Sequence, residues 1–178
     1  MTSCPASAVT LTLLEFKVTA DAGQDVNIYS FNFGAILSDN ATATDLYISN
    51  ITLYNKADLA TPLNNRVATS TGGAAYAAST TVADSDFGKN DVSLSRSGDI
   101  EVFHDTTSTV MDIIPAGTIV TYVVKAAVSG SAQYDSIIMR VSDWSTGDKN
   151  ALRWGDQWVA GIDSTYVKVL PTDYASLK

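Results

Sequence analysis

The chain has very few of the residues on which most enzymes and metal sites depend. Its 178 residues include a single histidine, His104, and a single cysteine, Cys4. One cysteine cannot form a disulfide within the chain, and one histidine with one cysteine cannot supply the ligands of an ordinary zinc site. The sequence also contains no Gly-x-Ser-x-Gly nucleophile elbow. We therefore predict that the protein is not an enzyme and that His104 is structural or faces solvent.

Charged residues and long apolar runs are scarce as well. Only 17% of the residues are charged and the net charge is −8, which disfavours binding to nucleic acid and to anionic membranes. No apolar run reaches the roughly 18 residues that a membrane span requires. Met1 leads directly into polar residues, without a recognisable signal peptide. Because Thr, Ser, Ala, Asn and Asp replace most Lys and Glu, we expect a mature extracellular or cell-surface protein.

The pattern of apolar residues predicts an all-β fold. Short alternating runs are separated by Gly, Asn, Asp, Ser and Pro, and no stretch has a convincing helical period. We expect about nine strands in a two-sheet antiparallel β-sandwich, either immunoglobulin-like or jelly-roll-like. Residues 8–178 would form one domain, and residues 1–7 a flexible N-terminal tail that carries Cys4. The sequence leaves open whether Cys4 is free, paired with another chain or modified.

Two strands have informative patterns. In the run 8–20, Val9, Leu11 and Leu13 share one face, and then the phase slips so that Leu14, Phe16, Val18 and Ala20 share a face. Such a slip requires a β-bulge or a strand that passes from one sheet to another. Similar slips occur in 26–33 and 46–54. The cleanest alternation is in 118–128, which places Val120, Tyr122, Val124, Ala126 and Val128 on one face.

Further expectations concern the remaining segments. The stretch 61–83 reads as a long surface loop with a short edge strand. Residues 92–94 and 100–103 would form a hairpin around Ser97-Gly98, and Pro115-Ala116-Gly117 would form a turn. Strands are also expected at 110–114, 136–141, 151–154 and 165–170. The sequons at Asn40 and Asn50 are weak signals in a chain so rich in Asn and Thr.

Carboxylates and tryptophans supply the remaining site candidates. Glu15 and Glu101 are the only glutamates and are expected to point outward from strands. Loop aspartates form two candidate Ca²⁺ sites, one from Asp84, Asp86 and Asp91 and one from Asp143 and Asp148, although solvated turns explain both groups and no cofactor is expected. Trp144, Trp154 and Trp158 would cap one end of the sandwich or contact a partner, or alternatively stack on sugar rings.

Three segments together carry a resemblance to a known group of proteins. They are Ile48-Ser49-Asn50-Ile51-Thr52-Leu53-Tyr54, then Ile114 to Thr118 leading into Tyr122 to Ala126, and finally Tyr166 to Pro171. The pattern resembles secreted immunoglobulin-like sandwich domains of prokaryotic surface proteins, notably those of small-genome uncultured bacterial lineages. The resemblance implies a surface, adhesive or assembly role and carries no catalytic residues.

These observations lead to two functional hypotheses. The first is a self-associating subunit of a surface filament or surface layer, in which Val9, Leu11 and Leu13 are inserted into a neighbouring molecule. Its alternative is a first strand that stays within its own chain and passes from one sheet to the other. The second hypothesis is a carbohydrate-binding or adhesin-type module that uses Trp144, Trp154 and Trp158.

Overall fold

The structure is a computed structural model that describes residues 8–38, 46–71, 94–95, 97–105, 109–131, 134–142, 152–155 and 162–163. These residues contain eleven strands and no helix, so the predicted all-β class is confirmed. The strands are β1 Val9–Thr19, β2 Val26–Ser38, β3 Tyr47–Asn55, β4 Arg66–Thr71, β5 Leu94–Ser95, β6 Ser97–Phe103, β7 Asp112–Ile114, β8 Ile119–Ser129, β9 Ser136–Val141, β10 Leu152–Gly155 and β11 Ile162–Asp163.

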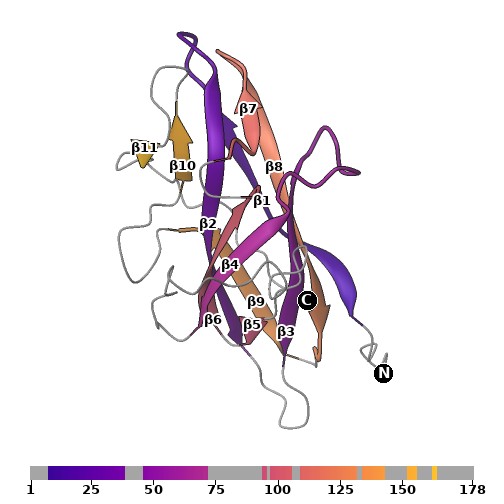
Figure 1. Cartoon of the computed structure of the whole chain (residues 1–178). Coiled ribbons are helices and arrows are strands. Elements are labelled where there is room, and N and C mark those ends of the chain that lie inside the picture. The colour runs from indigo at the N-terminus through magenta and orange to yellow at the C-terminus, as the bar shows by residue number, and fades with distance from the viewer. Residues whose placement is uncertain are drawn as a thin grey trace.

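The strands form two antiparallel sheets that pack face to face (Figure 1). The first sheet has the order β1-β8-β3-β5. The second has the order β11-β10-β2-β6-β4, and β7 and β9 also pair with β2. The two-sheet antiparallel sandwich expected from the sequence is therefore confirmed, with several of the eleven strands only two to four residues long.

Strand β2 is the centre of the second sheet. On one side, its residues 30–36 pair with β6 and its residues 26–28 pair with β7. On the other side, residues 33–38 pair with β9 and residues 27–31 with β10. Each side of this 13-residue strand is thus covered by two short strands in succession. Its two ends are held by different parts of the chain, which ties distant segments into one sheet.

Strand β8 has the same central place in the first sheet, and both of its neighbours contain a bulge at the same level. In β1 the register shifts between Thr12 and Leu14, which leaves Leu13 as the extra residue. In β3 the shift lies between Ser49 and Thr52, where Asn50 has a φ of 50°. Asparagine tolerates this left-handed conformation better than most residues. The phase slips read from the sequence are confirmed here as bulges.

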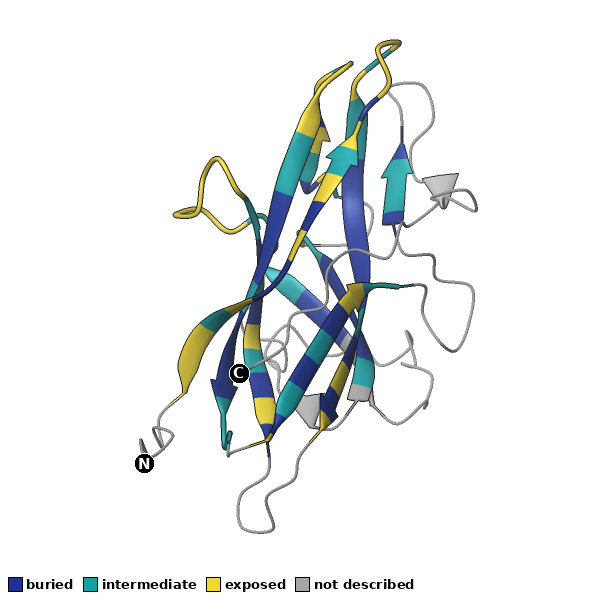
Figure 2. Ribbon diagram, turned by 180° about the vertical axis from the view of Figure 1, so that it is seen from behind, coloured by how far each residue is buried: buried dark blue, intermediate teal, exposed yellow. Residues whose placement is uncertain are grey.

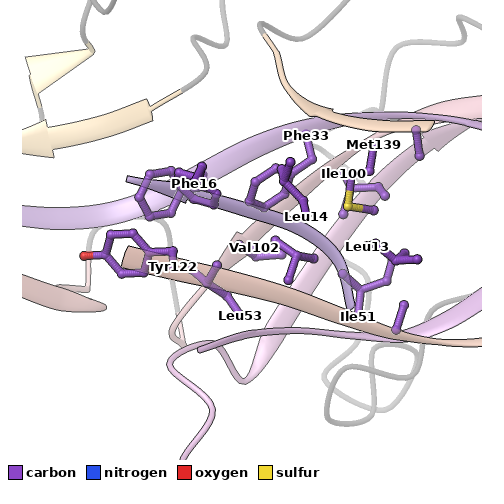
Figure 3. Close-up of a cluster of buried hydrophobic side chains, with 14 of the residues drawn as sticks. Leu13, Leu14, Phe16, Phe33, Ile51, Leu53, Ile100, Val102, Tyr122 and Met139 are labelled. Carbon is purple, nitrogen blue, oxygen red and sulfur yellow. The ribbon is translucent and has the colours of Figure 1, made fainter. Parts of the chain in front are cut away.

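The core lies between the sheets and is richest where four aromatic rings meet. Phe16 of β1 lies edge-on to Phe31 of β2, with ring centroids 5.1 Å apart, and stacks on Tyr122 of β8 at 5.5 Å. Phe33 completes the group, with its ring centroid 5.8 Å from that of Phe16 (Figure 3). The inward face predicted for 118–128 is also confirmed, because Tyr122, Val124, Ala126 and Val128 are buried and Val120 packs against the core.

The turn before β8 follows the predicted pattern. Gly117 has a φ of 69°, which is unfavourable for residues with a side chain. The Thr118 hydroxyl donates a hydrogen bond to the Pro115 carbonyl at 2.6 Å, and the Ala116 N–H donates to an Asp25 carboxylate oxygen at 2.9 Å. This turn carries the chain from β7 in the second sheet to β8 in the first.

The predicted hairpin around Ser97-Gly98 is wrong. Strand β5 pairs with β3 in the first sheet, whereas β6 pairs with β2 and β4 in the second, so the chain changes sheets between them. Gly98 lies inside β6, opposite Ala35 and Thr71, and is not a turn residue. The segment 61–83 does contain the expected edge strand, β4, which pairs with β6. The strand expected at 165–170 and the tail 1–7 lie outside the described residues.

Candidate assembly strand

The first half of β1 differs sharply in exposure from the second half. Ala8, Val9, Thr10 and Thr12 are exposed and Leu11 is half-buried, whereas Leu13 and Leu14 are almost completely buried. In Figure 2 this N-terminal end of the strand is coloured largely as exposed and lies at the margin of the molecule. We refer to Val9–Thr12 as the arm. The bulge at Leu13 is the boundary between the arm and the part of β1 that belongs to the core.

The exposure of the arm is a local property, because the strands beside it are well buried at the same level. Val9 lies opposite Val128 of β8, which in turn lies opposite Ile48 of β3. Val9 is 43% exposed, but Val128 is 4% and Ile48 is 0% exposed. All three face the same side of the first sheet. The core therefore reaches β8 and β3 at this level but covers the arm poorly.

The arm is held in its own chain by pairing with β8. Val9, Thr10, Leu11 and Thr12 lie opposite Val128, Ala127, Ala126 and Lys125, in antiparallel register. The first strand therefore stays in one sheet throughout its length, so the alternative of a strand that passes between sheets is wrong. Among the three predicted assembly residues, Leu13 belongs to the core, Leu11 packs partly against it and Val9 is exposed.

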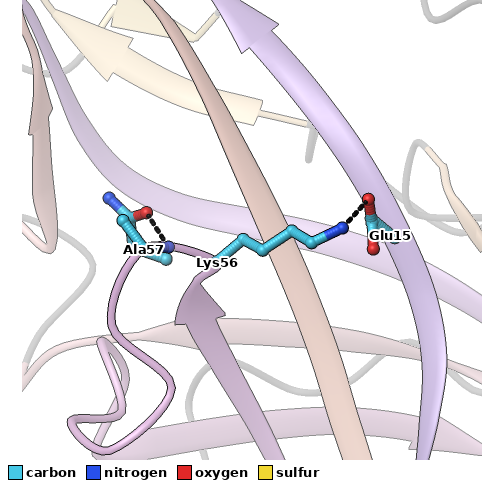
Figure 4. Close-up of polar contacts among 4 residues, drawn as sticks. Glu15, Lys56 and Ala57 are labelled. Atoms are coloured by element: carbon cyan, nitrogen blue, oxygen red, sulfur yellow. Dashed lines mark hydrogen bonds and ion pairs between the residues drawn. The ribbon is translucent and has the colours of Figure 1, made fainter.

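Beyond the bulge, the outer face of β1 is polar and charged. Glu15, Lys17 and Thr19 are exposed there, as predicted for Glu15. The Lys56 side chain extends from the turn after β3 across β8 (Figure 4). Its ammonium group lies 2.7 Å from a Glu15 carboxylate oxygen. Val123 of β8 lies between Glu15 and Tyr54 in the register and is only 4% exposed. The ion pair thus spans all three strands of this part of the sheet.

The outer face of the second sheet carries a buried polar group, formed by Ser30, Asn32 and Glu101. Glu101 points outward from its sheet, as predicted, but it is buried and not exposed to solvent. The Ser30 hydroxyl donates a hydrogen bond to its carboxylate at 3.1 Å, and Asn32, opposite Glu101 on β2, is also buried. Ser30, Asn32 and Gly34 alternate along β2, which is the signal that could have indicated a polar face.

The other candidate residues are only partly placed by the structure. Trp154 is half-buried on β10 and packs against the core, whereas Trp144 and Trp158 lie outside the described residues. Asp84, Asp86, Asp91, Asp143 and Asp148 also lie outside them, and so does Asn40. The described part of the chain contains no group of three or more His, Cys, Asp or Glu residues that could hold a metal ion. Sugar binding and Ca²⁺ binding therefore remain predictions.

His104 is half-exposed at the end of β6, and its Nδ1 atom lies 3.2 Å from an Asp105 carboxylate oxygen. Asp105 has a φ of 54° and is tied to the loop before β4, because its N–H donates to the Asn65 side-chain oxygen at 2.7 Å. The side chain of His104 is 42% exposed, which agrees with the prediction that His104 is structural or faces solvent.

No helix among the described residues is long and apolar enough to cross a membrane. No protein-family model, curated protein or solved structure matches the chain. The resemblance to immunoglobulin-like surface domains therefore remains a prediction from the sequence.

Proposed function

We propose that the chain is an extracellular structural protein, a subunit of a cell-surface filament or surface layer, and that it assembles by donating its arm to a neighbouring molecule. The observation that supports this proposal is the contrast across Leu13. From Leu13 onward β1 is anchored in the core of its own domain, whereas the arm is held mainly by its pairing with β8.

The alternation within the arm suits strand donation. An added strand contributes main-chain hydrogen bonds along its edge and inserts every second side chain into the partner. Val9 and Leu11 supply such apolar side chains on one face, and Thr10 and Thr12 supply polar ones on the other. The composition described above and the resemblance to surface-protein domains support the extracellular location.

The test is a truncation that removes residues up to Thr12 and keeps Leu13. Leu13 must remain because it is 1% exposed, and its loss would damage the core. We expect the full chain to form ordered polymers by negative-stain electron microscopy and size-exclusion chromatography. The truncated chain should stay monomeric and should still unfold cooperatively. Polymers of the truncated chain, or a parent that is monomeric at every concentration, would contradict the proposal.

A further inference from the structure

We infer that the acceptor of the arm is β8 of a second copy of this chain, over Lys125–Val128, in the same register that the arm adopts within its own chain. This inference rests on the proposed function and specifies its partner and its docking site. Assembly is then an exchange, in which each arm leaves its own β8 and pairs with the β8 of a neighbour.

The acceptor edge is defined by what the arm covers. If the arm leaves, the main-chain groups of β8 at Lys125–Val128 lose their partners on that side, and Ala126 and Val128 lose an apolar neighbour. Unpaired main-chain groups of this kind are costly unless water or another strand pairs with them. A second copy of the arm restores every contact, because it places Val9 opposite Val128 and Leu11 opposite Ala126 again.

Simple addition of a strand to the outer edge of β1 fits the structure less well. That edge contains the Leu13 bulge and is flanked by the exposed charges of Glu15 and Lys17. Bulges and charged side chains are the features by which proteins prevent strands from pairing at a sheet edge. The β8 edge, in contrast, has no register shift between Lys125 and Val128 on its β1 side. Exchange therefore uses the Lys125–Val128 edge of β8, which already pairs with this strand in regular register.

The bulge also determines where the exchange stops. The ladder between β1 and β8 is interrupted at Leu13, so the arm can separate without disturbing the pairs from Leu14 onward. Leu13 and Leu14 are both buried in the core of their own molecule, and Phe16 is part of the aromatic cluster. These buried side chains hold the rest of β1 in place. The hinge is the backbone at the Leu13 bulge, from which the arm can swing away.

The inference can be tested with paired cysteines in a Cys4→Ser background. Thr10 and Ala127 are opposite each other on the outer face of the sheet, at a separation that a disulfide can bridge. In Thr10→Cys/Ala127→Cys, oxidation of isolated monomers should lock the arm to its own β8 and abolish assembly, and a reductant should restore it. Oxidation after assembly should instead link neighbouring copies, giving covalent multimers on a non-reducing denaturing gel.

The matched control is Lys17→Cys/Thr121→Cys, which joins the same two strands on the same face beyond the hinge. This pair should form a bond only within one chain, whether it is oxidised before or after assembly, and assembly should be unaffected. Covalent multimers from the control pair would contradict the position of the hinge.

The outcomes separate the inference from the proposed function. If the locked monomer cannot assemble but oxidised polymers contain no bond between chains, the arm is donated to another site, and only the inference is overturned. If the locked monomer assembles normally, the arm is not donated, and both fall. If bonds between chains appear but the product is a closed dimer of uniform size, exchange is supported and the filament is not, because mutual exchange closes a pair whereas serial exchange extends a chain.

Discussion

The hydroxyl of Tyr122 on β8 donates a hydrogen bond of 2.8 Å to a carboxylate oxygen of Asp112 on β7, and so links the two sheets of the sandwich. The ring of Tyr122 is completely buried and packs against Phe16 and Phe31, while its hydroxyl reaches the border of the core. Burial raises the pKa of the hydroxyl above its ordinary value, and the charge of Asp112 and the hydrogen bond to it raise the pKa further.

This link predicts a specific response to alkaline pH. The folded protein keeps the Tyr122 proton at a pH where the unfolded chain, with a tyrosine pKa near 10.0, begins to lose it. The contribution of the Tyr122 hydroxyl to the free energy of unfolding is therefore complete below pH 10 and decreases as the pH rises above 10. Tyr122→Phe should be less stable than the parent by about 1 kcal/mol at neutral pH, and the difference should shrink above pH 10. Urea unfolding from pH 8 to 11 measures both; a constant difference would contradict the argument.

Asn64 is expected to be one of the most sensitive polar residues. It is buried between β3 and β4, where its side-chain oxygen accepts a hydrogen bond from the Leu53 N–H at 2.7 Å and its amide nitrogen lies 3.3 Å from the carbonyls of Ile51 and Arg66. Asn64→Ala should lower the free energy of unfolding by about 1–3 kcal/mol, because buried main-chain groups lose their partner. Asn65→Ala is the control, because its bonds to Asp105 are exposed. Equal losses in the two variants would count against this explanation.

The ion pair between Lys56 and Glu15 should contribute little, despite its short distance. Both side chains are about half exposed, at 53% and 45%, so water and salt screen the attraction. A double-mutant cycle with Lys56→Met and Glu15→Gln should give a coupling free energy below about 1 kcal/mol that falls further with added salt. A larger, salt-independent value would show that the pair is effectively shielded from solvent.

A charge placed on the apolar face of the arm should block assembly. Leu11→Asp puts a carboxylate where the arm must enter an apolar site, whereas Lys17→Asp puts the same group on an exposed outer position of the same strand. We expect Leu11→Asp to remain folded and monomeric, and Lys17→Asp to form polymers. Sedimentation of both variants beside the parent decides the matter. Polymers from Leu11→Asp would mean that the inner face of the arm is not used.

Assembly should also depend on salt. Each copy carries a net charge of −8, so neighbouring copies repel one another at low ionic strength. Raising the salt concentration to about 0.15 M shortens the screening length to about 8 Å and should accelerate polymer growth, followed by light scattering. Slower growth at higher salt would indicate instead that ion pairs between copies drive the association.

The strands could be predicted from the sequence wherever apolar residues alternate within a single segment. The slip between Leu13 and Leu14 indicated a bulge, and the slip near Asn50 indicated another, because side chains alternate strictly along a regular strand. The inward face of β8 was equally clear. The sequence could not show that both bulges lie beside the same part of β8. That depends on the register between strands, which the pattern within one strand does not determine.

The failures have a common physical origin. Ser97-Gly98 has the composition of a turn, yet Gly98 pairs with Ala35 across the sheet, a contact between residues far apart in sequence. The burial of Glu101 could not be predicted, because nothing near it in sequence indicates that Ser30 bonds to it. The same holds for Asn64, whose hydrogen bonds are to main-chain groups of β3 and β4. Burial of polar groups depends on tertiary neighbours that a single sequence does not identify.

The paired bulges have a consequence for the shape of the first sheet. Between the rungs at Val124 and Ala127, four residues of β8 face five residues of β1, from Thr10 to Leu14, and five of β3, from Ser49 to Leu53. A β-bulge bends the strand that contains it and increases the local twist, so bulges on both sides of β8 should bend and twist the sheet at that level. The curvature belongs to the backbone of three strands together, so the direction in which the arm leaves the body should survive changes to its own side chains.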